Sequence, residues 1–268
     1  MTPCAGFCRR GAPAVCDDVA LPTPPAEALP LPACTSGFMI RADEALLLSA
    51  AVEADAVLMI DCCPGSLLVA GTPVGAAWPR AADSFDSRTR EQLTRQVTKA
   101  IRTRFERTAA QDVSYGVRQI TDVAIKALSP GINDPTTAVH ALGHSAALLC
   151  ELAGRRLGPR LLHDEQGRGR VVLHQPDLGD LLEMALAQPR RYGAADPAVL
   201  ARLFALLRDL AWCAAPDQRP AIIGQLARLR ATAAEKDFDA AELAPLAALA
   251  EQVEHALAGR WIPAARPC

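Results

Sequence analysis

The side chains best equipped for binding or catalysis lie in one segment of this chain, from Gln111 to Val139. The segment reads QDVSYGVRQITDVAIKALSPGINDPTTAV. Arg118 and Asp122 are four residues apart in it, so on a helix they lie one turn apart and can form an ion pair. The other candidates follow where this helix ends and the next begins: Ser129, Gly131, Asn133, Asp134, Thr136 and Thr137.

Two helices and a tight corner must position these groups. Apolar residues recur at helical spacing from Asp112 to Leu128. Ser129-Pro130-Gly131 should end that helix, because proline disfavours a helical residue before it and glycine readily adopts positive φ. Asp134 is expected to be the N-cap of the next helix, with Pro135 at its first position. The sequence therefore predicts a short, stiff corner over residues 129–137.

The corner allows two interpretations. A helix N-terminus exposes unpaired backbone N–H groups, and Thr136 and Thr137 add hydroxyl donors, so an anionic ligand could bind there. Alternatively, Asp134 takes up these N–H groups as a cap and repels anions, so the corner is purely architectural.

An enzyme hypothesis uses the same residues. A hydrolase or phosphate-ester-acting enzyme would need Arg118, Asp122, Asp134 and the two threonine hydroxyls to converge in one open pocket. The chain has no GxSxG motif, P-loop or post-strand GxGxxG. We therefore assign no catalytic residue and expect no cofactor.

His140 and His144 have the spacing of two metal ligands on one helix. No third ligand accompanies them at a suitable spacing, so no metal site is predicted.

A second hypothesis concerns a helix expected from Asp86 to about Ala110. Leu93, Val97, Ile101 and Phe105 would form its apolar stripe. A basic face over residues 88–107 could contact anionic lipid or nucleic acid, or could simply be a solvated outer face. Its cationic residues are Arg88, Arg95, Lys99 and Arg102.

Composition sets the limits for these hypotheses. The 268 residues are 50% hydrophobic and carry a net charge of −2, which gives a genuine core but no overall attraction for polyanions. Aromatic residues make up only 4%, so the sequence gives no strong nucleic-acid signal. Nine cysteines without paired CxxC motifs are expected to be reduced and cytosolic. No charge-poor apolar run is long enough to span a bilayer.

The predicted fold is mainly α-helical with a small β-containing N-terminal unit, which is an α+β class. Residues 1–36 are rich in proline and cysteine and are expected to be a disordered lead. Residues 37–80 should form a small α/β unit with a helix capped by Asp43 and three short strands. Its PGSLLVAGTPV phrase resembles the turn-strand pattern of barrel-sandwich carrier modules, although the unit has no lysine to carry a group. Residues 86–262 should form a helical domain, bundle-like in its C-terminal half.

Three phrases, SGFMIRAD, PGSLLVAGTPV and above all the segment from Gln111 to Val139, resemble the domain of unknown function 2254 family of bacterial predicted membrane proteins. The resemblance covers about Ser36 to Trp261. It implies the soluble C-terminal region of such proteins, on the cytosolic side of the inner membrane, with no established activity. Nothing before Gly37 could span a bilayer, which suggests either a detached soluble version or a truncated or frame-shifted start.

The leading functional hypothesis is therefore a non-enzymatic cytosolic module with an interaction, oligomerisation or ligand-sensing role. Its expected partners are a second copy of the chain and a membrane-embedded portion or protein.

Overall fold

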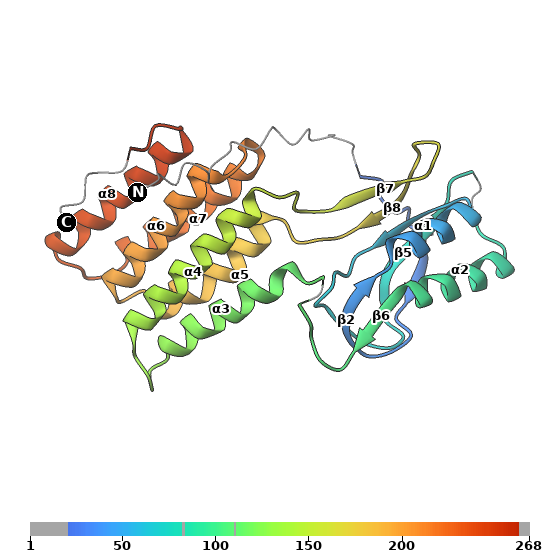
Figure 1. Ribbon diagram of the computed structural model, residues 1–268, viewed down its shortest axis with the longest axis horizontal. Coiled ribbons are helices and arrows are strands. Elements are labelled where there is room, and N and C mark those ends of the chain that lie inside the picture. Colours follow the sequence, from blue (N-terminus) through green and yellow to red (C-terminus); the bar gives the residue numbers. More distant parts are fainter. Residues whose placement is uncertain (1–20, 82–83, 110, 263–268) are drawn as a thin grey trace, which may run out of the picture. The chain divides into compact units, whose positions relative to one another are not determined.

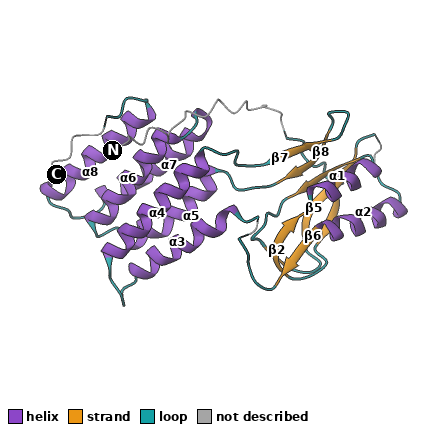
Figure 2. Cartoon of the chain, viewed as in Figure 1, coloured by secondary structure: helices purple, strands orange, loops and turns teal. Residues whose placement is uncertain are grey.

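The computed structural model describes residues 21–81, 84–109 and 111–262, and these form two compact units. The α/β unit contains the described residues up to Gly116 and returns for residues 158–177. The helical unit contains residues 117–157 and 178–262. All strands of the described residues belong to the α/β unit (Figure 2).

The α/β unit has two sheets and two helices. One sheet has the strand order β1-β5-β3-β8-β7 and the other has the order β4-β2-β6. Figure 1 labels β5, β7 and β8 of the first sheet and β2 and β6 of the second. The strands are β1 (Leu29–Pro32), β2 (Gly37–Ala42), β3 (Ala56–Ile60), β4 (Leu67–Leu68), β5 (Pro73–Pro79), β6 (Ile101–Arg104), β7 (Arg160–His163) and β8 (Gly169–Leu173). The helices are α1 (Glu44–Glu53), with Asp43 as its N-cap, and α2 (Ser87–Ala100), with Asp86 as its N-cap.

Strands β3 and β8 form the centre of the five-stranded sheet and run parallel, with Leu58 opposite Val171 and Ile60 opposite Leu173. The other pairs among the described strands are antiparallel. Parallel strands are normally covered on both faces and therefore read as continuous apolar runs. The AVLMI and VVL runs of β3 and β8 have this character and are almost entirely buried.

A buried ion network closes the start of this parallel pair. Arg170 is 1% exposed, and its guanidinium donates to Asp164 Oδ2 at 2.8 Å and to Asp55 Oδ1 at 2.7 Å. Burial alone would raise the pKa of Asp164, but hydrogen bonds from the Arg168 backbone N–H and from both guanidinium groups hold that pKa well below its usual range. The stabilisation from Asp164 is therefore present above the ordinary carboxyl pKa and is lost as the pH falls through the lowered value.

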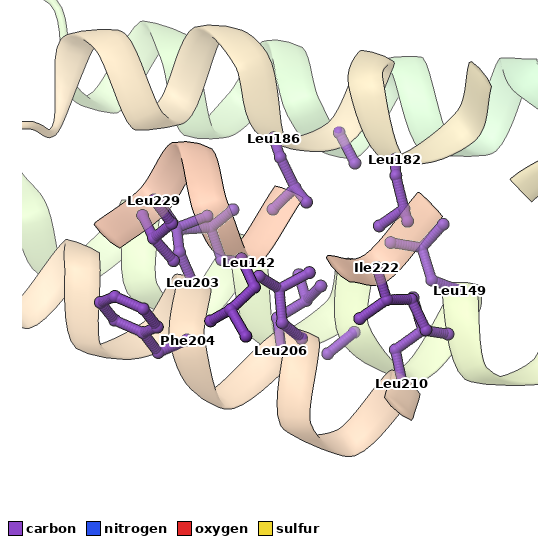
Figure 3. Close-up of a cluster of buried hydrophobic side chains, with 14 of the residues drawn as sticks. Leu142, Leu149, Leu182, Leu186, Leu203, Phe204, Leu206, Leu210, Ile222 and Leu229 are labelled. Atoms are coloured by element: carbon purple, nitrogen blue, oxygen red, sulfur yellow. The ribbon is translucent and has the colours of Figure 1, made fainter. Parts of the chain in front are cut away.

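The helical unit is organised around α6. Its helices are α3 (Val113–Ala127), which begins within the α/β unit, α4 (Pro135–Ala153), α5 (Leu178–Tyr192), α6 (Pro197–Cys213), a 3₁₀ turn (Pro216–Gln218), α7 (Arg219–Ala234) and α8 (Ala240–Leu257). Leucine side chains of α6 pack among those of its neighbours (Figure 3). The labelled core residues are Leu203, Phe204, Leu206 and Leu210 of α6, Leu142 and Leu149 of α4, Leu182 and Leu186 of α5, and Ile222 and Leu229 of α7.

The structure confirms the α+β class and the caps at Asp43 and Asp134. Part of the predicted lead is wrong, because Leu29–Pro32 forms β1; residues 1–20 lie outside the described residues. The strand tolerates its prolines because it is an edge strand, where a missing N–H costs no ladder hydrogen bond on the open side.

The predicted start of the helical domain at residue 86 is also wrong, because the α/β unit continues to Gly116. The helix from Asp86 ends at Ala100, and residues 101–104 form β6, which pairs with β2. Phe105 is consequently 94% exposed instead of lying in an apolar helix stripe. Alternation in Ile101–Arg104 suits a half-buried strand, and the pairing partner is far away in sequence.

The PGSLLVAGTPV phrase contributes to both sheets, with its β4 portion in the three-stranded sheet and its β5 portion in the five-stranded sheet.

Replacing Arg170 with methionine removes the buried guanidinium and leaves the Asp164 carboxylate without its innermost partner. We expect the free energy of unfolding to fall by on the order of 3 kcal/mol, measured by urea denaturation. Arg168→Met is the matched control, because the Arg168 side chain is 43% exposed and should cost below about 1 kcal/mol. Equal losses in the two variants would contradict a special role for the buried pair.

Candidate functional site

The predicted corner is present as a closed turn. Asn133 and Asp134 donate their backbone N–H groups to Ser129 O and Ala127 O at 2.9 and 2.8 Å, which ties the end of α3 to the start of α4. The residue with left-handed backbone is Asn133, at φ 47°, whereas Gly131 was expected to supply positive φ. Asparagine tolerates this conformation better than most residues, which explains why Asn133 can adopt it in place of Gly131.

The donors at the start of α4 are already engaged by Asp134. Its carboxylate accepts the Thr137 backbone N–H at 3.1 Å and the Thr137 hydroxyl at 2.5 Å. These hydrogen bonds, the one from the hydroxyl first, lower the pKa of Asp134. Thr136 is exposed and lies in the first turn beside them. A negative charge that occupies the helix start favours the architectural interpretation over anion binding.

The remaining predicted residues do not join this corner. Arg118 lies eleven residues before Ser129 on α3, which places it roughly 16 Å away along the helix axis. Asp122 is exposed, and the described residues contain no ion pair between it and Arg118. The convergence that a hydrolase would require is therefore not supported. In the described part of the chain, no group of three or more His, Cys, Asp or Glu side chains is placed to hold a metal ion.

The predicted basic face is divided between two elements. Arg88, Arg95 and Lys99 are exposed on α2, and Arg95 lies 3.9 Å from Glu91. Arg102 lies instead on β6, because the helix ends before it. A continuous helical face over residues 88–107 is therefore wrong.

A pocket that the sequence did not predict lies in the α/β unit, at the carboxyl ends of β3 and β8. The two strands are parallel, so the residues after Ile60 and after Leu173 meet at one edge of the sheet, where the His174 N–H donates to Ile60 O at 2.9 Å. Ligands of sheets with parallel strands commonly bind at this edge. The pocket has a volume of about 230 Å³ and is lined by Ala42, Glu44, Cys62, Pro64, Gln111, Arg160, Leu173, His174 and Gln175.

The charges of the pocket come from an ion pair between two elements. Arg160, the first residue of β7, donates two hydrogen bonds to the two carboxylate oxygens of Glu44, the first residue of α1, at 2.8 and 3.2 Å. Both side chains remain partly exposed, at 36% and 43%. Burial, followed by the nearby Asp61, raises the pKa of Cys62, so its thiol stays protonated and is a poor nucleophile.

A buried ion pair supports one wall of this pocket. Asp112 accepts a hydrogen bond from Arg107 Nε at 2.5 Å, and Arg107 also lies over the Tyr115 ring, 5.7 Å from its centroid. The hydrogen bond to Asp112 raises the pKa of Arg107. At Gly65, which has φ 96°, a side chain would overlap the Asp112 carboxylate. This packing fixes the turn beside Pro64 and the backbone next to Gln111.

One sequence signal could have indicated the pocket. Polar residues directly follow two buried apolar strands, as Asp61-Cys62-Cys63 after VLMI and as His174-Gln175 after VVL. Without the knowledge that these strands are parallel neighbours, the two groups could not be placed together.

The family model described as "Predicted membrane protein (DUF2254)" matches residues 12–209. The chain belongs to this family. Two uncharacterised proteins, one of Mycobacterium bovis and one of Mycobacterium tuberculosis, are each 34% identical to the chain over 220 residues, which is 81% of the chain and 41% of the relative. The chain thus spans about two fifths of the length of these relatives. No solved structure shows significant similarity to it.

The resemblance seen in the sequence is thereby confirmed. Within the described ranges, no helix has both the length and the apolar character that crossing a membrane demands.

Asp134→Ala tests whether the corner is architectural. The variant loses the cap of α4, so we expect the melting temperature of the protein to fall by a few degrees at neutral pH. Because the pKa of Asp134 is lowered in the folded state, the difference from the wild type should shrink as the pH falls below the ordinary carboxyl value of 3.8. Asp122→Ala, on an exposed position of α3, should leave the melting temperature unchanged. A pH-independent difference would argue against the cap.

Proposed function

We propose that this chain is a ligand-sensing module of its membrane-protein family and that the pocket at the carboxyl ends of β3 and β8 is the sensing site. The observation that carries this proposal is the convergence of polar side chains from four separate segments on one pocket. Glu44, Gln111, Arg160 and His174 lie far apart in the sequence, and only the fold brings them to one pocket. Polar residues scattered at random over a surface would not be expected to gather in this way.

The charge balance of the pocket indicates the class of ligand. One carboxylate and one guanidinium, Glu44 and Arg160, face the same small space, and two glutamine amides and an imidazole add further hydrogen-bonding groups. A small molecule with an ammonium and a carboxylate group, such as an amino acid, can bind to both charges at once. A volume of about 230 Å³ lies below the usual size of drug-like sites and suits such a small ligand.

We further propose that a membrane portion accompanies this module in the longer relatives and that the module lies on the cytosolic side. Support comes from the family's description as membrane proteins and from Cys34, Cys62 and Cys63, which are thiols, as expected in a reducing compartment. Self-association of the module is a further proposal, which sedimentation of the purified chain would test.

A thermal-shift screen of the purified chain tests the sensing site. Amino acids form the main panel, with simple carboxylates and simple amines as comparators that engage only one charge. A ligand at about 100 times its Kd stabilises the folded state by about 2.7 kcal/mol, which should raise the melting temperature by several degrees.

Arg160→Gln and Glu44→Gln should each abolish the shift while the variants stay folded. Arg88→Gln, which removes a guanidinium from the surface of α2 in the same unit, should retain it. A panel without any stabilising member, or a shift that survives both pocket substitutions, would refute the proposal.

A further inference from the structure

The three-stranded sheet of the α/β unit has one face that the core does not cover. Cross-strand partners share a face, and two rows of partners define this one. Leu67 of β4, Phe38 of β2 and Arg104 of β6 form the first row, and Arg41 and Arg102 form the second. A bulge in β2 before Arg41 keeps both rows on the same side. Strands β2 and β6 are seen side by side in Figure 1. We call these five residues the outer sheet face.

The outer sheet face carries positive charge that the fold neutralises only in part. Arg102 and Arg104 are exposed, and within the described ranges neither has an acidic side chain as an ion-pair partner. Arg41 is 54% exposed and donates to Asp43 at 3.2 Å. Arg41 and Arg102 are directly opposite each other, and like charges in this arrangement repel. Asp43 offsets this repulsion at Arg41, whereas an external anionic surface would offset it at Arg102 as well.

Apolar side chains accompany these cations. Phe105, the residue directly after β6, is 94% exposed, and Leu67 at the other side of the face is 65% exposed. Surfaces that bind membranes peripherally combine basic residues with exposed Phe or Leu side chains that enter the headgroup and acyl boundary. An aliphatic side chain such as Leu67 has no ring with which to stack on a nucleic-acid base. The mixture therefore fits an anionic bilayer better than a nucleic acid.

We propose that the outer sheet face, together with Phe105, binds the surface of an anionic lipid bilayer. Arg102 and Arg104 contact lipid phosphates, and the Phe105 ring enters the apolar boundary beneath them. The negative surface potential of the bilayer removes the repulsion between Arg41 and Arg102. This binding is independent of the proposed sensing pocket, which uses none of these residues.

Co-sedimentation of the full chain with vesicles tests the proposal. Vesicles of phosphatidylcholine mixed with phosphatidylglycerol should bind the chain, pure phosphatidylcholine vesicles should bind it far more weakly, and added salt should weaken binding. The double variant Arg102→Gln/Arg104→Gln should lose about 30-fold in affinity for the mixed vesicles. Phe105→Ser should lose about tenfold. These side chains are exposed, so circular dichroism should match that of the wild type and the melting temperature should not fall.

The matched control is Arg88→Gln/Arg95→Gln, which removes the same charge from exposed positions of α2 in the same unit. This control should bind mixed vesicles as the wild type does. An equal loss in the control would show that binding depends on the overall positive charge or on α2, and not on the outer sheet face. Equal binding to both vesicle types, or binding to an oligonucleotide without binding to vesicles, would overturn the proposal outright.

Discussion

The parallel pairing of β3 with β8 is the constraint on which the α/β unit depends. A segment more than a hundred residues further along the chain returns to lie beside Ala56–Ile60, and its valines and leucine complete the buried centre of the sheet. The two ends of the pair then acquire different roles. At the beginning, Arg170 is enclosed with Asp164 and Asp55 in an ion network that pins the returning hairpin. At the end, polar residues of both strands emerge together and line the pocket.

Features that arise from neighbours in sequence could be predicted, and features that arise from distant pairing could not. An aspartate cap is recognisable from its own few residues, so the predicted caps at Asp43 and Asp134 are correct. Residues 101–104 were assigned to a helix because Ile101 and Phe105 continue the spacing of Leu93 and Val97. Only the pairing with β2 shows that a strand is more favourable there. The pocket could not be predicted from the sequence for the same reason, since Glu44 and Arg160 are brought together by tertiary structure alone.

The most distinctive phrase in the sequence thus has a structural explanation. The corner between α3 and α4 has a residue with left-handed backbone at Asn133 and a carboxylate that binds a backbone N–H and a hydroxyl of Thr137. Each of these needs a particular residue type, so a specific motif can arise without any ligand. Membership of the DUF2254 family, which the phrase suggested, holds irrespective of whether the corner binds anything.

The helices inserted between β6 and β7 have a consequence for biosynthesis. The ribosome completes β3 long before β8 exists, and the intervening residues 117–157 belong to the other unit. Until residue 173 has emerged, the open side of β3 lacks its neighbour, and the backbone groups of an apolar strand remain available to any other extended chain. During this interval, a chaperone that covers the nascent α/β unit would prevent β3 from pairing with the wrong strand.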